Sequence, residues 1–578
     1  VKLIKYMRRF YVPIVMVIIF AIASTVFNIV GPTILGDATT EIFKGLVRKV
    51  SGGSGIDFDK VKHILLMLLS LYVASAIFSF IQGLIMTHVS NNVSYQMRKD
   101  ISEKIHRMPM KYFESRTYGE VLSRVTNDVD TLGQSLNQSM TQIITSATQI
   151  VGVFIMMIRI SIPMTIAVLL TLPLSMGLIG LIMSKSQPYF KAQQKHLGEL
   201  NGQVEEIYSG HNIVKAFNKE ESVIEEFKEV NGKLYNSAWR SQFFSGAMMP
   251  LMQFVGNLGY VAVTILGGYL AIKKTIEVGQ IQSFLQYVRN FSQPITQLAQ
   301  VGNMMQTTAA SAERVFEFLE EEEEIEVEKD AVPVDTLAGN VTFEHVNFGY
   351  NKDQTIINDF SVDVKEGQKV AIVGPTGAGK TTLIKLLMRF YDVNGGCIKV
   401  DGHDIREFKR SDLREMFGMV LQDTWLYNAS IRDNIRYGKL DATDEEVIEA
   451  AKLANADSFI ERLPQGYDTV LTGDGANLSQ GQRQLLSIAR AAIADPPVLI
   501  LDEATSSIDT RTEKIVQEGM DRLMHGRTTF VIAHRLSTIK NSDCIMVLEQ
   551  GRIIERGSHD DLIEEQGRYY QLYTGNKA

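Results

Sequence analysis

The sequence has few cysteines and no excess of basic residues, and both absences narrow the possible functions. Its two cysteines, Cys397 and Cys544, lie far apart, which excludes a disulfide framework and is typical of a reducing cytosol. The formal net charge of −8 at pH 7 argues against nucleic acid as the main partner. We expect no cleavable signal peptide, because the first apolar run is too long for one and others follow it.

Long stretches without charge are abundant, and all of them fall in the first half of the chain. A helix needs about 20 apolar residues to span the hydrocarbon core of a membrane. Six stretches are candidates, the last interrupted by Arg289: residues 12–35, 64–86, 132–158, 160–184, 241–272 and 278–312. Soluble core helices rarely run so long without charges. The sequence therefore predicts an all-α transmembrane domain of six helices over residues 1–315, rather than a soluble helical bundle.

The charges of the loops predict the orientation of these helices. Lys and Arg gather before the first helix, between the second and third, and between the fourth and fifth, and the other loops are poorer in them. Because positive loops stay in the cytosol, the N-terminus is expected there, and six crossings return the chain to the same side. The two long cytosolic segments have helical patterns, with breaks expected at residues 114–124, near Gly119, and at 210–217. Each break is either a contact with a motor domain or an ordinary turn.

Residues 316–340 form an acidic linker with five consecutive glutamates, Glu320–Glu324. Since like charges repel and stay solvated, the run predicts a solvated hinge between the membrane domain and a soluble domain at 341–578.

The soluble part contains a phosphate-binding loop of the pattern G-x-x-x-x-G-K-[ST]. The loop follows an apolar strand at 370–373 and precedes a helix, and its residues are Gly374, Pro375, Thr376, Gly377, Ala378, Gly379, Lys380, Thr381 and Thr382. Its glycines let backbone N–H groups close on phosphates at a helix N-terminus. We expect Lys380 to reach the β- and γ-phosphates and Thr381 to hold Mg²⁺.

Two further features complete a candidate ATP site. The apolar run 498–501 predicts a buried strand, and two carboxylates, Asp502 and Glu503, follow at its ligand-binding end. Asp502 is expected to support Mg²⁺, and Glu503 to orient or deprotonate the attacking water. Tyr350 offers a ring that can stack on adenine.

A family resemblance enters with Leu478, Ser479, Gln480, Gly481 and Gln482, which resemble the ABC signature LSGGQ. With the phosphate loop and the acidic strand end, residues 341–578 resemble an ABC-type nucleotide-binding domain, an α/β P-loop NTPase. With six helices ahead of it, the whole chain resembles a bacterial half-size ABC exporter of the multidrug or lipid type. Gln480 replaces the first glycine of the family signature.

The resemblance implies roles for further residues. Tyr350 matches the adenine-stacking aromatic, Gln422 matches the glutamine that senses Mg²⁺ and contacts the membrane domain, and His534 matches the switch histidine that acts with Glu503. Ser507, Ile508 and Asp509 match the D-loop, and the two cytosolic breaks match coupling helices.

The resemblance also implies a dimer that uses ATP and Mg²⁺. The phosphate loop of one subunit and the Ser479 helix tip of the other enclose each ATP, so one chain cannot complete a site. The expected partner is a second half-transporter subunit, with a heterodimer favoured over a homodimer. ATP-driven closure of the dimer then switches the membrane cavity from inward- to outward-facing.

The sixth apolar stretch carries a polar stripe on one helical face: Gln282, Gln286, Arg289, Gln293, Gln297 and Gln300. Polar side chains at membrane depth face protein or water rather than lipid. The stripe therefore either lines a cargo cavity or forms a polar interface between helices.

Two functions remain open for the chain. The first is ATP-driven efflux of amphipathic small molecules, drugs or lipids across the bacterial plasma membrane. The second is an ATP-gated channel or regulatory membrane protein without pumping. The presence of Glu503 and His534 favours the exporter, since pumping needs turnover.

Overall fold

The computed structural model describes residues 2–325, 331–334, 337–351, 353–421, 424–473, 475–502, 510–532 and 539–574. By their internal contacts the residues fall into two units. The first consists of Val1–His106 with Tyr118–Glu321, and the second consists of Arg107–Thr117 with Glu322–Ala578.

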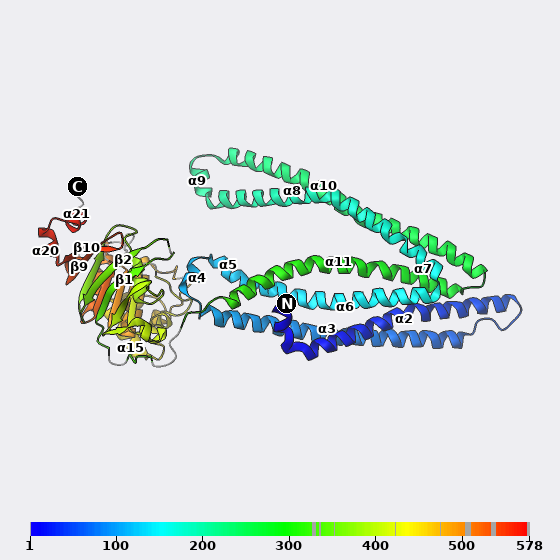
Figure 1. Cartoon of the computed structure of the whole chain (residues 1–578), viewed down its shortest axis with the longest axis horizontal. Helices are drawn as coiled ribbons and strands as arrows, with labels where there is room; N and C mark the ends of the chain where they lie inside the picture. Colours follow the sequence, from blue (N-terminus) through cyan, green and yellow to red (C-terminus); the bar gives the residue numbers. More distant parts are fainter. Residues whose placement is uncertain are drawn as a thin grey trace. The chain divides into compact units, whose positions relative to one another are not determined.

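All the secondary-structure elements described in the first unit are helices, joined by short turns. Its long helices, seen in blue to green in Figure 1, are α2 (Tyr11–Val50), α3 (Phe58–Ile105), α6 (Val129–Ile160), α8 (Thr171–Ser209), α10 (Glu220–Ile272) and α11 (Val278–Glu320). Short elements connect or precede them: α1 (Lys2–Tyr6), η1 (Met7–Phe10), α5 (Tyr118–Ser123), the π-helical η2 (Arg124–Asp128), α7 (Ile162–Leu169) and α9 (His211–Ala216).

Five helical stretches in the described part of the chain are long and apolar enough to cross a membrane: Met7–Val50, Phe58–Ile105, Tyr118–Ile160, Ile162–Ser209 and Glu220–Ile272. The predicted sixth crossing corresponds to α11, a helix of 43 residues that is not among the five. Its glutamine stripe lowers its hydropathy, so the sixth crossing stays a prediction.

The helix breaks have local causes. The third and fourth predicted crossings are separated at Ser161, which caps α7 by accepting a hydrogen bond from the Met164 N–H, with a proline in the first turn of α7. The second cytosolic break is confirmed, because α8 ends at Ser209 and the short α9 precedes α10. The first cytosolic break falls within the expected range 114–124 but not at Gly119, which lies inside α5. The chain leaves helix α4 (Met110–Glu114) instead at residues 115–117, before α5 begins.

Helices α2 and α11 approach each other through glycines. A Cβ on Gly279 would lie 1.8 Å from the Gly36 carbonyl oxygen, so the two backbones are in direct contact there. The Gly279 N–H donates to Thr40 Oγ1 at 3.1 Å, and Lys44 pairs with Glu277 at 2.6 Å. Small residues allow this close packing, and the polar contacts then fix the register of the two helices.

The second unit contains two sheets. The antiparallel sheet has the order β2-β1-β4-β5, formed by β1 (Val341–Phe348), β2 (Ile357–Val364), β4 (Gly395–Val400) and β5 (His403–Asp404). The larger sheet has the order β10-β9-β3-β8-β7-β6, formed by β3 (Lys369–Val373), β6 (Phe417–Val420), β7 (Val498–Asp502), β8 (Thr528–Ile532), β9 (Cys544–Glu549) and β10 (Arg552–Gly557). All its pairs are parallel except β9 with β10.

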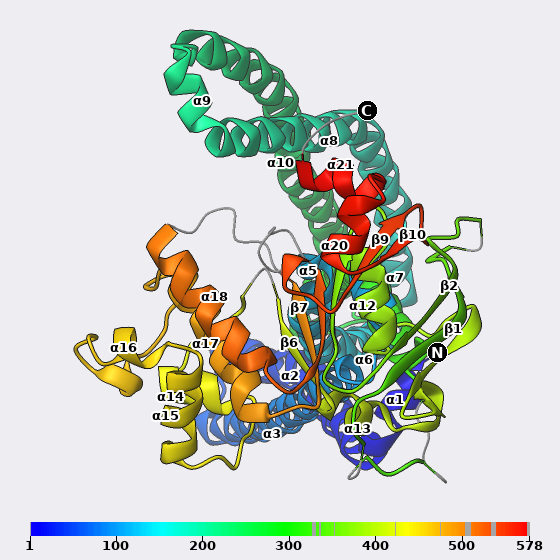
Figure 2. The ribbon, with the colours of Figure 1, turned by 90° about the vertical axis from the view of Figure 1, so that its left-hand side faces the viewer.

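Helices cover the larger sheet. Figure 2 shows α17 (Gln480–Ala494) and α18 (Thr510–Met524) on one side of it, and α12 (Lys380–Leu387) with β1 and β2 on the other. Strand β3 alternates accordingly: Ala371 and Val373 join the core under α17, whereas Val370 and Ile372 join the core under α12. The remaining described helices are α13 (Arg410–Glu415), α14 (Ile431–Arg436), α15 (Asp444–Leu453), α16 (Asp457–Ile460), α20 (His559–Glu564), α21 (Arg568–Thr574) and the 3₁₀ turns η3 (Ile405–Glu407) and η4 (Gly466–Asp468).

The acidic run is partly exposed and partly paired, and its role as a hinge stays a prediction. Helix α11 extends to Glu320, which pairs with Lys2 at 2.5 Å. In the second unit Glu323 pairs with Arg107 at 3.0 Å. The Glu324 side chain is only 14% exposed and lies 3.4 Å from the Arg414 guanidinium. Basic residues distant in sequence thus pair with Glu320, Glu323 and Glu324, contacts that the charge pattern alone does not reveal.

Candidate nucleotide-binding site

The phosphate-binding loop joins β3 to α12 through three glycines with positive φ. These are Gly374 (φ 153°), Gly377 (φ 84°) and Gly379 (φ 102°), and Gly379 directly precedes α12. At Gly374 a Cβ would also lie 2.2 Å from the Leu548 carbonyl oxygen. Backbone conformation and close packing therefore both require glycine at this position.

Lys380 reaches back across the loop. Its Nζ donates to the carbonyl oxygens of Gly374 at 2.7 Å and Pro375 at 3.0 Å. Burial lowers the pKa of Lys380 below its ordinary value, and the nearby Asp502 carboxylate opposes that shift. The ammonium is thus held within the loop, where an anion would compete favourably with the two carbonyls for its protons.

Strand register brings Asp502 to the same sheet edge as the loop. Asp502 is paired with Ile532 of β8, and Ile532 is also the partner of Ile372 in β3. Parallel strands present their carboxyl ends at one edge, so Asp502 lies two strands away from the phosphate loop at equal depth.

The donor set fits a magnesium ion. The Thr381 side chain is exposed beside Lys380, and Asp502 supplies a carboxylate at the same edge. Among the described residues there is no group of three or more His, Cys, Asp or Glu that could hold a metal by itself. Mg²⁺ bound with a nucleotide needs only one or two protein ligands beside phosphates and water.

Tyr350 lies beside the loop in a cluster of aromatic rings. Its hydroxyl is 3.2 Å from Thr382 Oγ1, which places the phenol next to the start of α12. The rings of Phe348 and Tyr391 are each 5.1 Å from its ring, both in edge arrangements. The half-buried ring is therefore positioned by its neighbours rather than mobile on the surface.

The signature residues form the N-terminus of α17. Ser479 is its N-cap: its hydroxyl accepts from the Gln482 N–H at 3.3 Å, and its own N–H donates to Gln482 Oε1 at 2.9 Å. Leu478 and Gly481 are buried, whereas Ser479 is exposed and Gln480 half-exposed. This helix tip of a 15-residue helix presents a hydroxyl and N–H groups outward, as phosphate recognition requires.

Several predicted site residues lie outside the described part of the chain: Gln422, Glu503, Ser507, Ile508, Asp509 and His534. Their roles stay predictions.

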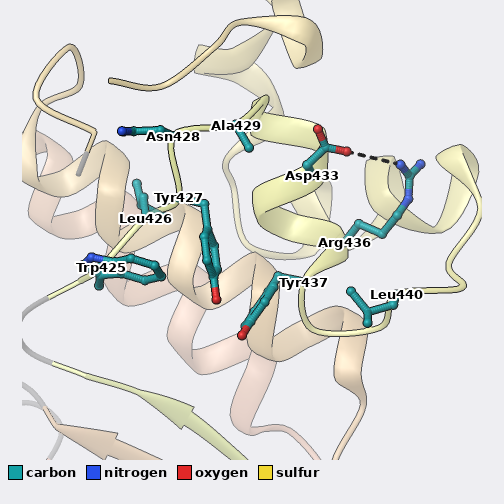
Figure 3. Close-up of a pocket in the computed structure, with 9 residues that line it drawn as sticks. All are labelled: Trp425, Leu426, Tyr427, Asn428, Ala429, Asp433, Arg436, Tyr437 and Leu440. Atoms are coloured by element: carbon teal, nitrogen blue, oxygen red, sulfur yellow. Dashed lines mark ion pairs between the residues drawn. The ribbon is translucent and has the colours of Figure 1, made fainter. Parts of the chain in front are cut away.

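A pocket that the sequence analysis missed follows directly after Gln422. Its volume is about 570 Å³ and Figure 3 shows its lining: Trp425, Leu426, Tyr427, Asn428, Ala429, Asp433, Arg436, Tyr437 and Leu440. Trp425 and Tyr427 have ring centroids 4.2 Å apart, and Tyr427 and Tyr437 4.6 Å apart. The sequence feature that could have indicated this pocket is its three aromatic residues, Trp425, Tyr427 and Tyr437, within 13 positions.

Arg490 of α17 contacts several residues that form this pocket. Its guanidinium donates to the carbonyl oxygens of Asn434 at 2.9 Å and Trp425 at 3.1 Å, and lies 5.4 Å from the Tyr437 ring centroid. Burial lowers the pKa of Arg490 below its ordinary value. The pocket is therefore fastened to the helix that begins at Ser479.

The glutamine stripe of α11 divides into two groups. Gln282 accepts a hydrogen bond from Thr39 of α2, and Gln297 accepts one from Ser146 of α6 at 3.1 Å, so both contribute to helix interfaces. Arg289, Gln293 and Gln300 are exposed, and Gln286 is half-buried. The Arg289 guanidinium lies 5.4 Å from the ring centroid of Tyr260.

Comparison with known families agrees with this geometry. The family model of the ABC transporter transmembrane region matches residues 14–295, and that of the ABC transporter matches residues 357–506. The chain belongs to the ABC exporters that fuse a helical membrane domain to an ATP-binding α/β domain, as half of a transporter. The predicted fold class and the ABC ATPase coupled to transport are thereby confirmed.

Relatives cover nearly the whole chain. The fatty acid ABC transporter ATP-binding/permease protein of Mycobacterium tuberculosis is 43% identical, and the match covers 96% of this chain and 93% of that protein. The ATP-dependent lipid A-core flippase of Syntrophus aciditrophicus is 37% identical, covering 89% and 86%. A bacterial Atm1-family ABC exporter with ATP bound has a TM-score of 0.75 at 28% identity, covering 99% and 98%.

Gly374→Ala should weaken ATP binding about tenfold or more, because the new methyl group displaces the loop from the Leu548 carbonyl. Equilibrium binding of ATP to the purified protein measures this. Gly367→Ala is the matched control: Gly367 has a positive φ of 73° but nothing within 4 Å of an added Cβ. Equal losses in the two variants would contradict this, because they would show that the close approach at Gly374 is not the cause of the loss.

Proposed function

We propose that the chain is one half of an ATP-driven exporter that moves amphipathic small molecules, drugs or lipids across the bacterial plasma membrane. One observation supports this proposal most: the same polypeptide contains apolar helices of membrane length and a loop that positions Lys380 to bind phosphate. The relatives named for fatty acid and for lipid A-core support a cargo with an apolar body and a polar head. The N-terminus and the nucleotide unit are assigned to the cytosol.

A second subunit is needed to complete the machine. The tip of α17 at Ser479 is exposed to solvent in the single chain, so it is open to contact by another subunit. In α8 only Ser186 is buried among the described residues, because α8 packs mainly on α10 and leaves its other sides open (Figure 1). Both open surfaces suit a partner subunit. We assign a heterodimer in preference to a homodimer, and the mass of the purified complex distinguishes the two.

At the nucleotide site, each residue has a separate task. Lys380 and the N–H groups of the loop bind the β- and γ-phosphates, and Tyr350 stacks on adenine. Thr381, Gln422 and Asp502 would hold Mg²⁺, which neutralises charge on the transferred phosphoryl group. Glu503 orients the attacking water, His534 assists at the γ-phosphate, and Ser479 of the partner subunit closes the site.

Hydrolysis removes the γ-phosphate that links the two nucleotide units, and so resets the transport cycle. Binding of ATP across the dimer favours one membrane conformation, and loss of the phosphate favours the other. Alternating access follows from this two-state coupling.

The exposed part of the α11 stripe is assigned to the cargo path. Gln282 and Gln297 serve helix interfaces, so the residues left for cargo are Gln286, Arg289, Gln293 and Gln300. Their amide and guanidinium groups would contact the polar part of an amphipathic cargo.

The aromatic pocket lined by Trp425, Tyr427 and Tyr437 is assigned as the docking surface for a cytosolic loop of the partner subunit. Trp425 and Tyr437 are 53% and 51% exposed, although large aromatic side chains usually lie buried. The loop at α9 carries a matching apolar surface, with Ile213 66% and Phe217 70% exposed. Contact of the two surfaces would remove both from water.

Purified protein in inside-out vesicles should accumulate amphipathic dyes against their gradient when ATP is added. Glu503→Gln should retain ATP binding and slow turnover about 10²-fold or more, because the base for the water is lost. Dye uptake and phosphate release are measured on the same vesicles. An ATP-gated channel would instead equilibrate the dye without accumulation, and Glu503→Gln would still open it.

Gln286→Leu and Gln293→Leu should change transport of individual cargoes by up to about tenfold while basal ATPase activity persists, because a cargo-contacting amide is lost. Transport of a panel of dyes and lipids is compared with ATP turnover. Gln306→Leu, an exposed glutamine on α11 outside the stripe, is the control. Unchanged transport of every cargo would contradict the assigned path.

Trp425→Ala and Tyr437→Ala should reduce transport of all cargoes about tenfold while ATP binding is retained, since aromatic anchors dominate protein interfaces. The ratio of dye transported to ATP hydrolysed reports this uncoupling. Ile554→Ala, which truncates an exposed apolar residue on β10, is the control. A normal ratio in both pocket variants would remove the docking assignment.

A further inference from the structure

Part of the first cytosolic loop belongs to the nucleotide unit. Residues Arg107–Thr117, including α4, are grouped with the ATP-binding domain by their contacts. Tyr112 of α4 is only 4% exposed, and the Arg116 guanidinium lies 4.0 Å from the centroid of its ring. The short helix is thus fixed in the unit by packing, and Glu114 at its end is held in place.

Glu114 accepts hydrogen bonds from two side chains of the ATP-binding domain. Lys385 Nζ donates to Oε1 at 2.6 Å, and the Tyr391 hydroxyl donates to Oε2 at 2.6 Å. The Lys385 and Glu114 side chains are 26% and 31% exposed. A partly desolvated pair with both carboxylate oxygens engaged is stronger than an ordinary surface ion pair.

Both partners of Glu114 also contact Tyr350. Lys385 Nζ lies 5.6 Å from the centroid of the Tyr350 ring, and the Tyr391 ring is 5.1 Å from it at an angle of 84°. Lys385 lies on α12, one turn beyond Thr382, whose hydroxyl meets that of Tyr350. One carboxylate therefore fixes two of the groups that surround the predicted adenine-stacking ring.

The charges of this cluster persist at neutral pH. Burial raises the pKa of Glu114, but the hydrogen bonds from Lys385 and Tyr391 outweigh it and hold the pKa below its ordinary value. Burial lowers the pKa of Lys385, and its hydrogen bond to Glu114 outweighs this and raises the pKa. Glu114 is thus an anion that holds a cation against the Tyr350 ring.

We propose that Glu114 is a positioning residue for the adenine base of ATP, acting through Lys385 and Tyr391 on the orientation of Tyr350. The inference rests on the proposed adenine-stacking role of Tyr350. Glu114, a residue of the first cytosolic loop, would then help to support the surface that binds the base. By thermodynamic reciprocity, a movement of this loop then changes ATP affinity, and ATP binding biases the position of the loop by the same factor.

A purely structural tether would have a different signature. If Glu114 only held α4 in place, its loss would disturb the phosphate loop and the base surface alike, because α12 carries both Lys380 and Lys385. A positioning role affects only ligands that have a base. Inorganic triphosphate has the phosphates of ATP without the base, so the ratio of the two affinities separates the roles.

The test uses the full-length protein in lipid nanodiscs with Mg²⁺. Displacement of a fluorescent ATP analogue by ATP or by inorganic triphosphate gives both dissociation constants. Glu114→Gln should weaken ATP binding about fivefold, at the lower end of common coupling strengths, and leave triphosphate binding within about twofold. Tyr391→Phe keeps the ring and removes the hydroxyl donor, and should weaken ATP binding in the same direction.

Controls assign the effect to this cluster. Glu344→Gln breaks another carboxylate–lysine contact of the same unit, Glu344 with Lys399 at 2.7 Å, and should change neither constant. Glu114→Gln and Lys385→Gln combined should weaken ATP binding less than the product of the single effects, because both variants break one contact.

Two results would overturn the proposal: ATP affinity unchanged in both Glu114→Gln and Tyr391→Phe, or equal losses for ATP and triphosphate. Tyr350→Leu separates this from failure of the proposed adenine site. If Tyr350→Leu weakens ATP binding and the Glu114 variant does not, only the positioning role fails. If Tyr350→Leu has no effect, the adenine-stacking role itself is wrong.

Discussion

The parallel pairing of β3, β8 and β7 is the constraint on which the rest of the ATP-binding domain depends. It places the loop after Val373 and the carboxylate of Asp502 at one edge of the sheet. Strand β3 lies inside the sheet between β8 and β9, with Ala371 and Val373 facing one core and Val370 and Ile372 the other. A loop that leaves so rigid a strand keeps its glycines and Lys380 in a defined geometry before any ligand arrives.

Near this edge of the sheet, the nucleotide unit has three surfaces whose contacts could change when nucleotide binds. The tip of α17 at Ser479 is exposed. Arg490 connects the same helix to the aromatic pocket after Gln422. On the side of Tyr350, Lys385 and Tyr391 connect α12 and its neighbours to Glu114 of the first cytosolic loop. Two separate contact networks thus lead away from the nucleotide edge within this unit, one through α17 and one through α12.

Much of this was predictable from sequence because it depends on local pattern. The phosphate loop needs glycines and a lysine at fixed spacing, and long uncharged runs indicate membrane helices regardless of their neighbours. What escaped prediction depends on contacts between distant residues. The glutamate run was expected to be solvated, yet its last member, Glu324, is only 14% exposed beside Arg414. Gly119 was expected to break a helix, yet the break follows Glu114, which is bound by residues far along the chain.

The glycine contact between α2 and α11 limits how the helical unit can move. Because the Gly36 and Gly279 backbones touch, no side chain lies between them to rearrange gradually. The Gly279 N–H bond to Thr40 and the pair of Lys44 with Glu277 lock the same end of the two helices. Sliding by even one residue would break these contacts together. The two helices are therefore expected to move together as a rigid body or to separate fully at this end. Opening here would then be a two-state change rather than a gradual one.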